Sequence, residues 1–204
     1  SLVAKALQAD YRVISQSGWG VLSSWDGDPT HNIPDYYEKI CGLAAKGENE
    51  KCGAAEAYDF SSWKPDYIFI NLGTNDASAF SQPSTYKDKN GILFDQRMET
   101  DGSLEKASVQ RFQDAVFYFI KKVRKCNPTA YIIWGYGMLG STLEDVIVQT
   151  IEMYQKESGD ERIEFMELVS ANIETVGSRE HPGFLCHRQA AEKIVERIEQ
   201  FNKE

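Results

Sequence analysis

Three short apolar segments, spaced far apart, constrain the fold of this chain more than any other feature. Two of them are continuous apolar runs that end in glycine, and the third is a weaker, alternating run. Short apolar runs bounded by turn residues predict strands buried in a parallel sheet. The segments are residues 66–72 (DYIFINL), 130–134 (AYIIW) and 162–168 (RIEFMEL).

Long amphipathic segments alternate with these strands. Apolar residues at helical spacing predict helices over residues 104–125, 142–156 and 184–201. Strands that alternate with helices indicate an α/β sandwich with a mostly parallel sheet and right-handed crossovers. The first 45 residues are less regular. Here the pattern predicts a helix over residues 2–7, a strand over 11–15 (YRVIS), a functional loop over 16–34 and a helix over 35–45.

Size and composition narrow the class of protein. A chain of 204 residues is predicted to form one domain, 1–204. Its net charge of −9, without a cluster of basic residues, makes nucleic acid an unexpected partner. No apolar run approaches the roughly eighteen residues of a membrane span, so we expect no membrane partner. Four cysteines without a C-x-x-C pair leave the redox compartment open.

Metal binding is not expected. The closest approach to ligand spacing is His181 with Cys186 and His187, which is a weak pattern for zinc. No G-x-G-x-x-G or P-loop follows a predicted strand, so a nucleotide- or flavin-binding domain ranks last among the alternatives. No other segment indicates an organic cofactor.

Polar residues follow the predicted strands where ligands bind in such sheets, at their carboxyl ends. We expect residues 15–25, 73–80 and 135–140 to line one edge. In G-T-N-D (Gly73 to Asp76), the Asn75 amide could donate to a developing oxyanion, or the turn could be an ordinary Asx turn. His181 before Pro182 could be a general base or a structural histidine.

The order of these motifs is more specific than any one of them. A glycine-rich turn ending in Gly20, then G-T-N-D, then His181-Pro182 resembles the SGNH, or GDSL, hydrolases. The segments LVAKALQADYRVISQSGWG, PDYIFINLGTND and HPGFLCHRQAAEKI look most like carbohydrate esterase family two. The resemblance implies a three-layer sandwich with a flavodoxin-like sheet, a deacetylase of xylan or mannan, no cofactor, and a secreted or cell-surface location. It leaves the oligomeric state open.

The resemblance also implies roles for individual residues. His181 would be the general base, and the Gly20 N–H and the Asn75 amide would bind the oxyanion. Substrate would contact Trp19, Trp25 and Trp134. Other aromatic side chains beside the predicted loops could stack on sugar rings or simply pack: Tyr36, Tyr37, Phe80 and Tyr86.

One catalytic motif of the family is missing. Its nucleophile lies in a Gly-Asp-Ser block after the first, central strand, and this tripeptide does not occur here. The nearest echoes, residues 27–29 and 101–103, do not follow an apolar strand. We therefore expect an N-terminally incomplete domain that is unstable alone, associates or rearranges. The alternatives are a natural remnant without hydrolytic power and a non-catalytic carbohydrate-binding or interaction domain.

The acid that orients the histidine is a second departure. In many relatives it lies three residues before the histidine, where this chain has Ser178. Some relatives use a main-chain carbonyl instead, and residues 134–138 are a plausible source of one. We expect a serine–histidine dyad, with Glu180 as a weaker candidate acid because adjacent residues rarely face each other.

Overall fold

The sheet is built from the three predicted apolar segments. A computed structural model describes residues 1–82, 85–88, 90–201 and 203. Strands β1 (Tyr67–Ile70), β2 (Tyr131–Tyr136) and β3 (Ile163–Glu167) lie parallel in the order β1-β2-β3. The predicted strands and their parallel arrangement are confirmed.

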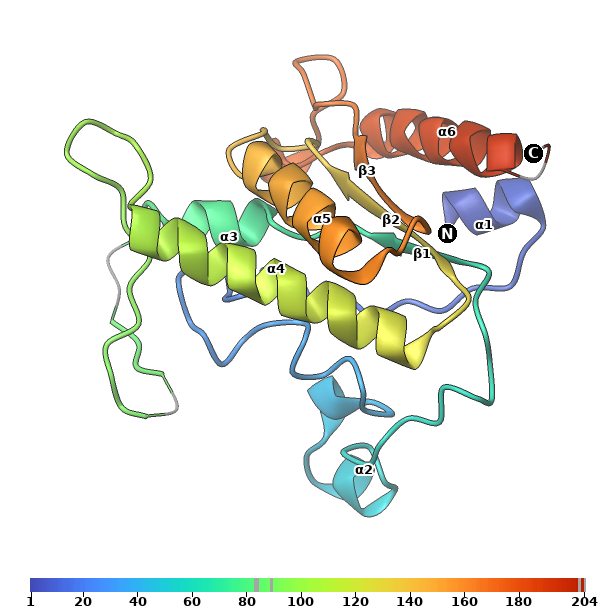
Figure 1. The fold of residues 1–204 in the computed structure, drawn as a ribbon, viewed down its shortest axis with the longest axis horizontal. Coiled ribbons are helices and arrows are strands. Elements are labelled where there is room, and N and C mark those ends of the chain that lie inside the picture. The colour runs from blue at the N-terminus through green and yellow to red at the C-terminus, as the bar shows by residue number, and fades with distance from the viewer. Residues whose placement is uncertain (83–84, 89, 202, 204) are drawn as a thin grey trace.

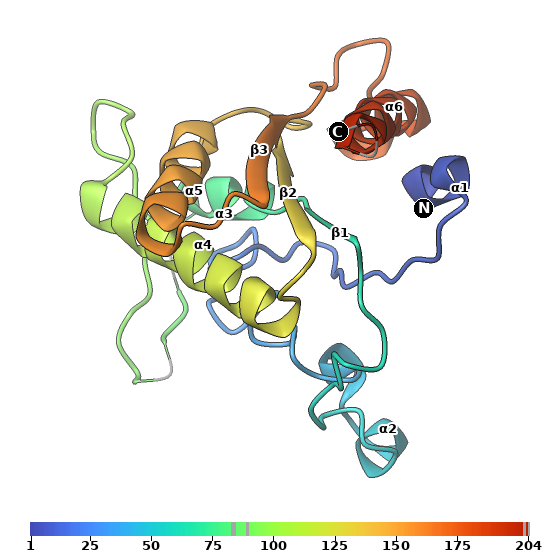
Figure 2. The same cartoon turned by 45° about the vertical axis from the view of Figure 1, so that its right-hand side comes forward.

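Helices cover both faces of this sheet. They are α1 (Leu2–Leu7), α2 (Glu48–Lys51), α3 (Thr74–Ala79), α4 (Lys106–Cys126), α5 (Glu144–Ser158) and α6 (Phe184–Phe201), with 3₁₀ turns at Gly42–Ala44 and Ser178–Glu180. Helices α4 and α5 lie on one side of the strands, and α6 lies with α1 on the other (Figures 1 and 2). The expected three-layer α/β sandwich is confirmed.

Side chains of β2 point alternately to the two faces of the sheet, and each face carries its own hydrophobic core. Ile132 and Trp134 face the large core that α4 and α5 close, whereas Ile133 faces a smaller core under α6. All three side chains are fully buried. Since successive residues of a strand point to opposite faces, a six-residue strand can anchor both helical layers.

Two of the predicted elements are wrong. Residues 11–15 form no strand, and Tyr11, Val13 and Ile14 are 51%, 67% and 47% exposed. Among the described residues, no strand lies beside them to accept their backbone hydrogen bonds. A β-rich sequence becomes a strand only when such a partner exists.

Residues 35–45 form turns instead of the predicted helix. Their backbone pairs with residues 54–58, where Ile40 N–H donates to the Glu56 carbonyl and Cys41 N–H donates to that of Ala54. These tertiary hydrogen bonds use donors that a helix would have satisfied internally. Local helical spacing was therefore overridden by pairing with a distant segment.

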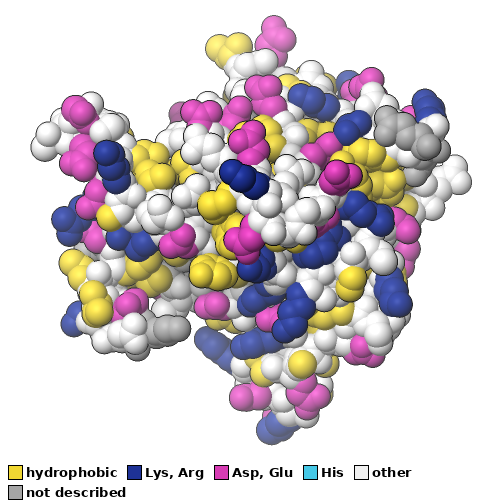
Figure 3. Space-filling model, viewed as in Figure 1, with side chains coloured by type: hydrophobic (Ala, Val, Ile, Leu, Met, Phe, Trp, Pro, Cys, Tyr) yellow, Lys and Arg dark blue, Asp and Glu magenta, His cyan; other side chains and the backbone are white. Residues whose placement is uncertain are grey.

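Charged side chains of both signs are interspersed over α4 and α5 (Figure 3). Three basic residues near the end of α4 are ion-paired: Lys121 with Glu157, Lys122 with Glu38, and Arg124 with Asp160. Within the described residues, no helix has the length and apolar character to cross a bilayer.

Candidate active site

The glycine-rich loop and the G-T-N-D turn meet at the carboxyl edge of the sheet. The Asn75 amide donates to the Trp19 carbonyl over 2.9 Å. The Asp76 carboxylate accepts three backbone N–H groups of the same loop, from residues 21–23. Of the three segments predicted to line one edge (15–25, 73–80 and 135–140), the first two therefore contact each other there.

The turn itself rests on the end of β2. Gly73 has φ +122°, and a Cβ at this position would lie 3.0 Å from the Tyr136 ring. Only glycine fits both conditions easily, so the strand can bend sharply into α3. Tyr136 is buried, and its burial raises the pKa of its hydroxyl to about 12. It therefore remains a neutral packing group beneath the turn at ordinary pH.

Asn75 keeps donor capacity for a ligand. Its side chain is only half-buried, and its amide carries two hydrogens, of which one is used on Trp19. In the described part of the chain we find no protein acceptor for the second. That hydrogen could be donated to an oxygen bound at the edge, so Asn75 stays a candidate oxyanion donor.

The geometry assigns a different role to Gly20 than the sequence did. Its N–H already donates to the Ser23 carbonyl over 2.8 Å, so the expectation of an oxyanion donor at Gly20 is wrong. Gly18 has φ +79°, and its N–H has no partner among the described residues. Gly18, two residues earlier, is therefore the candidate donor of this loop. Sequence motifs could not reveal which N–H the folded loop uses internally.

His181 is held by the segment that carries it. Its Nδ1 lies 2.8 Å from the Arg179 carbonyl oxygen, and the ring is exposed. A carbonyl oxygen can only accept, so Nδ1 must carry the proton in this contact. The neutral ring then has its lone pair on Nε2. This is the tautomer that a general base needs.

The carbonyl that orients His181 does not come from the expected segment. We predicted residues 134–138 as its source, and Arg179 supplies it instead. The Arg179 and Glu180 backbones are left-handed, at φ 53° and 61°, and this bend brings the carbonyl back to the ring. Among the described ion pairs there is none between Glu180 and His181. Left-handed backbone at arginine and glutamate has no sequence signature.

The three predicted substrate tryptophans have different environments. Trp134 is fully buried and donates to the Leu72 carbonyl, so its assignment to substrate binding is wrong. Trp19 is half-buried and stacks on His31 with ring centroids 4.8 Å apart. Trp25 is 51% exposed beside Gly18. Two further aromatic residues considered above are core residues: Tyr37 and Phe80.

Neither the metal candidate nor the Gly-Asp-Ser echoes form a site. Cys186 is buried, with its thiol 3.5 Å from the Val169 carbonyl, and no group of three metal-binding side chains occurs among the described residues. Ser103 is exposed and bonds to Asp101 within its own turn. The expectation that residues 101–103 do not present a nucleophile agrees with this position.

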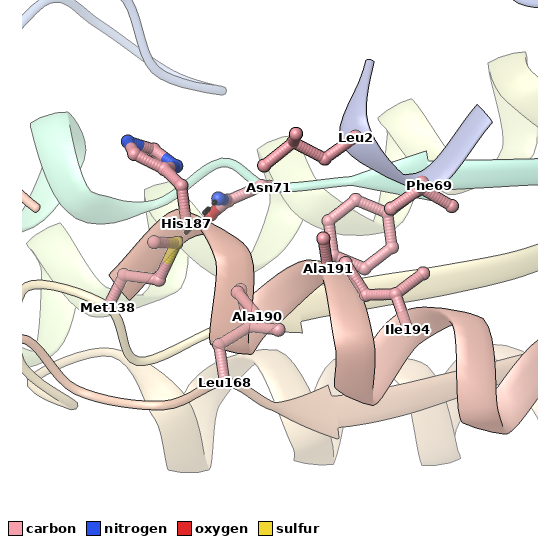
Figure 4. A pocket seen from close by; sticks show the side chains of 10 residues that line it. Leu2, Phe69, Asn71, Met138, Leu168, His187, Ala190, Ala191 and Ile194 are labelled. Carbon is pink, nitrogen blue, oxygen red and sulfur yellow. Dashed lines mark hydrogen bonds between the residues drawn. The ribbon is translucent and has the colours of Figure 1, made fainter. Parts of the chain in front are cut away.

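The outer edge of β1 is open beside an apolar cavity. Within the described residues only β2 pairs with β1, and Phe69 is 37% exposed there. A cavity of about 320 Å³ separates this edge from α1 and α6 (Figure 4). It is lined by Leu2, Val3, Phe69, Asn71, Met138, Leu168, His187, Ala190, Ala191 and Ile194.

Several solved structures share the fold of this chain. An acetyl xylan esterase from the rumen bacterium Butyrivibrio proteoclasticus is 44% identical over 99% of this chain and 54% of its own, with a TM-score of 0.95. A family two carbohydrate esterase from Clostridium thermocellum, solved with cellohexaose, is 24% identical over 99% of this chain and 53% of its own, with a TM-score of 0.74. A putative GDSL-like lipase from Bacteroides ovatus shares the fold with a TM-score of 0.53.

Curated sequences agree with these structures, although no family model matches the chain. Cellulase/esterase CelE of Acetivibrio thermocellus is 25% identical over 97% of this chain and 21% of its own length. An acetylxylan esterase / glucomannan deacetylase of Cellvibrio japonicus is 35% identical over 38% of this chain and 20% of its own. The chain thus spans about a fifth of these curated relatives and about half of the structural ones. Along nearly its whole length, the chain is similar to the carbohydrate esterases of family two and has the fold that they share with a GDSL-like lipase.

Proposed function

We propose that this chain is the larger part of a carbohydrate O-acetylesterase that removes acetyl groups from a plant polysaccharide such as xylan or mannan. The observation that carries the proposal is the 44% identity to an acetyl xylan esterase over 99% of the chain. The geometry supports it, since an oriented histidine and two unoccupied N–H donors occur among the residues of the family's motifs.

His181, Asn75 and Gly18 have separate roles in the proposed serine–histidine mechanism. His181 Nε2 takes the proton of a serine hydroxyl as its oxygen bonds to the acetyl carbon. The carbonyl oxygen becomes an anion, which the Asn75 amide and the Gly18 N–H stabilise. The protonated His181 then gives its proton to the departing sugar oxygen, which leaves an acetyl-serine. In the second half of the reaction His181 takes a proton from water, the water oxygen bonds to the acetyl carbon, and the serine oxygen leaves with that proton as acetate is released. The Arg179 carbonyl accepts from Nδ1–H whether the ring is neutral or protonated, so it keeps the imidazole oriented throughout.

The nucleophile would be supplied by a further strand. We place it beside β1, whose outer edge is unpaired among the described residues and adjoins the apolar cavity. A strand there would satisfy the β1 backbone, bury Phe69 and bring its carboxyl end to the same edge as Asn75. In the natural protein this strand would precede Ser1, so that 1–204 is an incomplete esterase domain.

Two tryptophans are proposed to contact the carbohydrate. Trp25 offers an exposed indole next to Gly18, and the half-buried Trp19 follows Gly18 in the same loop. Flat aromatic faces bind sugar rings well because they cover the apolar C–H groups of the ring. The third candidate, Trp134, is withdrawn because its side chain is sealed in the core.

Active-site labelling tests the function directly. The natural full-length protein is treated with a fluorophosphonate probe, which reacts with serines activated by a base. We expect a labelled Gly-Asp-Ser peptide upstream of Ser1 and loss of labelling in His181→Ala, by at least about 10³-fold in rate. Tyr118→Ala is the control, since Tyr118 is exposed on α4 and has no assigned catalytic role.

The opposite result points to a binding domain. If the folded full-length protein takes no label and releases no acetate from acetylated xylan, the esterase proposal fails. Retained binding to the same polysaccharide would then support a non-catalytic role for this fold.

A further inference from the structure

The loop that carries Gly18 is tied to the G-T-N-D turn by one buried carboxylate. Asp76 is 1% exposed and accepts hydrogen bonds from the N–H groups of Val21, Leu22 and Ser23, at 2.9, 2.7 and 3.1 Å. Burial raises the pKa of this carboxyl, whereas the three N–H donors favour its ionised form, in which both oxygens accept hydrogen bonds. An asparagine has one oxygen and would turn its NH₂ group against at least one of these N–H groups.

Gly20 brings the loop into contact with this carboxylate. A Cβ at Gly20 would lie 2.1 Å from Asp76 Oδ2, far inside any tolerated contact. The absence of a side chain at Gly20 therefore allows the backbone of residues 20–23 to lie directly on Asp76. This accounts for a glycine at a position whose own N–H is not free for a ligand.

The neighbour of Asp76 faces the same loop. Asn75, on the first turn of α3, donates to the Trp19 carbonyl over 2.9 Å. The G-T-N-D turn thus binds the loop on both sides of Gly20. The Asn75 amide donates to the residue before Gly20, and the Asp76 carboxylate accepts from the three residues after it. The Gly18 N–H and the free Asn75 N–H are held in one rigid unit by these four hydrogen bonds.

We propose that Asp76 is a positioning residue. It sets the loop of residues 18–23, here called the Gly18 loop, against Asn75, so that the Gly18 N–H and the free Asn75 N–H converge on one oxygen. This inference rests on the proposed esterase function. Donors stabilise an oxyanion strongly only when they are fixed before the reaction begins. Removing the carboxylate would leave three N–H groups without this acceptor, two of them on buried residues, and let the loop move. Asp76 would act without touching substrate.

The test uses Asp76→Asn in the natural full-length enzyme. We expect kcat for p-nitrophenyl acetate to fall about 10²-fold, as expected when oxyanion donors are misplaced. The KM should change less than about threefold, since ground-state binding does not depend on these donors. Affinity for a boronic acid that forms a tetrahedral serine adduct should fall in parallel with kcat.

A matched control separates positioning from simple destabilisation. Asn127 is also buried and donates to the Tyr37 hydroxyl over 2.8 Å, at the C-terminal end of α4 away from the site loops. Asn127→Ala should lower thermal stability and leave kcat of the folded enzyme unchanged. If Asp76→Asn behaves like this control, with kcat within threefold of wild type, the inference is overturned.

A second variant covers the possibility that Asp76→Asn does not fold. Gly20→Ala keeps the carboxylate and pushes the loop away from it. It should lose kcat without a matching rise in KM, and wild-type kcat in this variant would also overturn the inference. If the wild-type protein itself shows no esterase activity, the proposed function fails, and the inference falls with it.

Discussion

The two halves of the candidate site are held in different ways. The Gly18 loop is fixed by Asn75 and Asp76, more than fifty residues further along the chain, and its anchor is fully buried. His181 is exposed and is oriented by a carbonyl only two residues away. The Gly18 loop, which would stabilise the oxyanion, is therefore anchored in the core. The His181 segment, which would transfer protons, is shaped by a short, local backbone bend.

This contrast separates stability from catalysis. Damage to the Gly18 loop should lower both the free energy of unfolding and the rate, because buried polar groups lose their partners. Damage to the His181 segment should lower the rate alone, because little of the core depends on it. Substitutions in each half test this division.

Asn75→Ala should have the largest effect. We expect kcat to fall by about 10²- to 10³-fold, as is typical for loss of one side-chain oxyanion donor. The free energy of unfolding should also fall by about 1 kcal/mol, because the Trp19 carbonyl loses its donor. Steady-state kinetics and urea unfolding of the full-length enzyme would measure the two effects.

Ser78→Ala is the control on the same helix. Ser78 is exposed and its hydroxyl bonds only to the Thr74 carbonyl one turn earlier. In this variant, kcat and the free energy of unfolding should both equal the wild-type values within experimental error. A kcat for Asn75→Ala equal to that of Ser78→Ala would remove Asn75 from the mechanism.

The same contrast explains what the sequence could predict. Asn75 and His181 could be named as candidates from the sequence because their motifs are local and lie next to strongly patterned elements such as β1 and α6. The choice between Gly18 and Gly20 was missed because it depends on which N–H the loop uses internally. The strand expected over residues 11–15 failed for a related reason, since strand pairing is a property of two segments and not of one.

Alkaline pH should lower the free energy of unfolding, because two core tyrosines are buried in their neutral form. Burial raises the pKa of Tyr136 and of Tyr37 to about 12 from the usual 10. Since the unfolded chain ionises first, the stabilisation is complete below pH 10 and is lost as the pH rises from 10 to 12. We expect a loss of about 2 kcal/mol per tyrosine over this interval.

Urea unfolding at several pH values from 8 to 12 would measure this loss. Tyr136→Phe should flatten the alkaline slope in part, because Tyr37 and other groups with a raised pKa, such as Tyr131 and Tyr154, still titrate. Tyr118→Phe is the control, since Tyr118 is 67% exposed on α4. An unchanged slope in Tyr136→Phe would show that the packing beneath Gly73 does not depend on a neutral phenol.

Arg179→Gly should have the smallest effect and the opposite sign on stability. A left-handed backbone costs a non-glycine residue about 1 kcal/mol or more, whereas glycine adopts it freely. Part of this gain is offset by the greater entropy of the unfolded chain, so we expect a net stabilisation of at most about 1 kcal/mol. The same freedom lets the Arg179 carbonyl leave His181, and kcat should fall a few-fold at unchanged KM.

Glu174→Gly, in the preceding exposed loop without a left-handed backbone, should instead lose stability and keep kcat. If both variants lose stability equally, the bend at Arg179 is not strained, and the His181 segment is held by more than its local backbone.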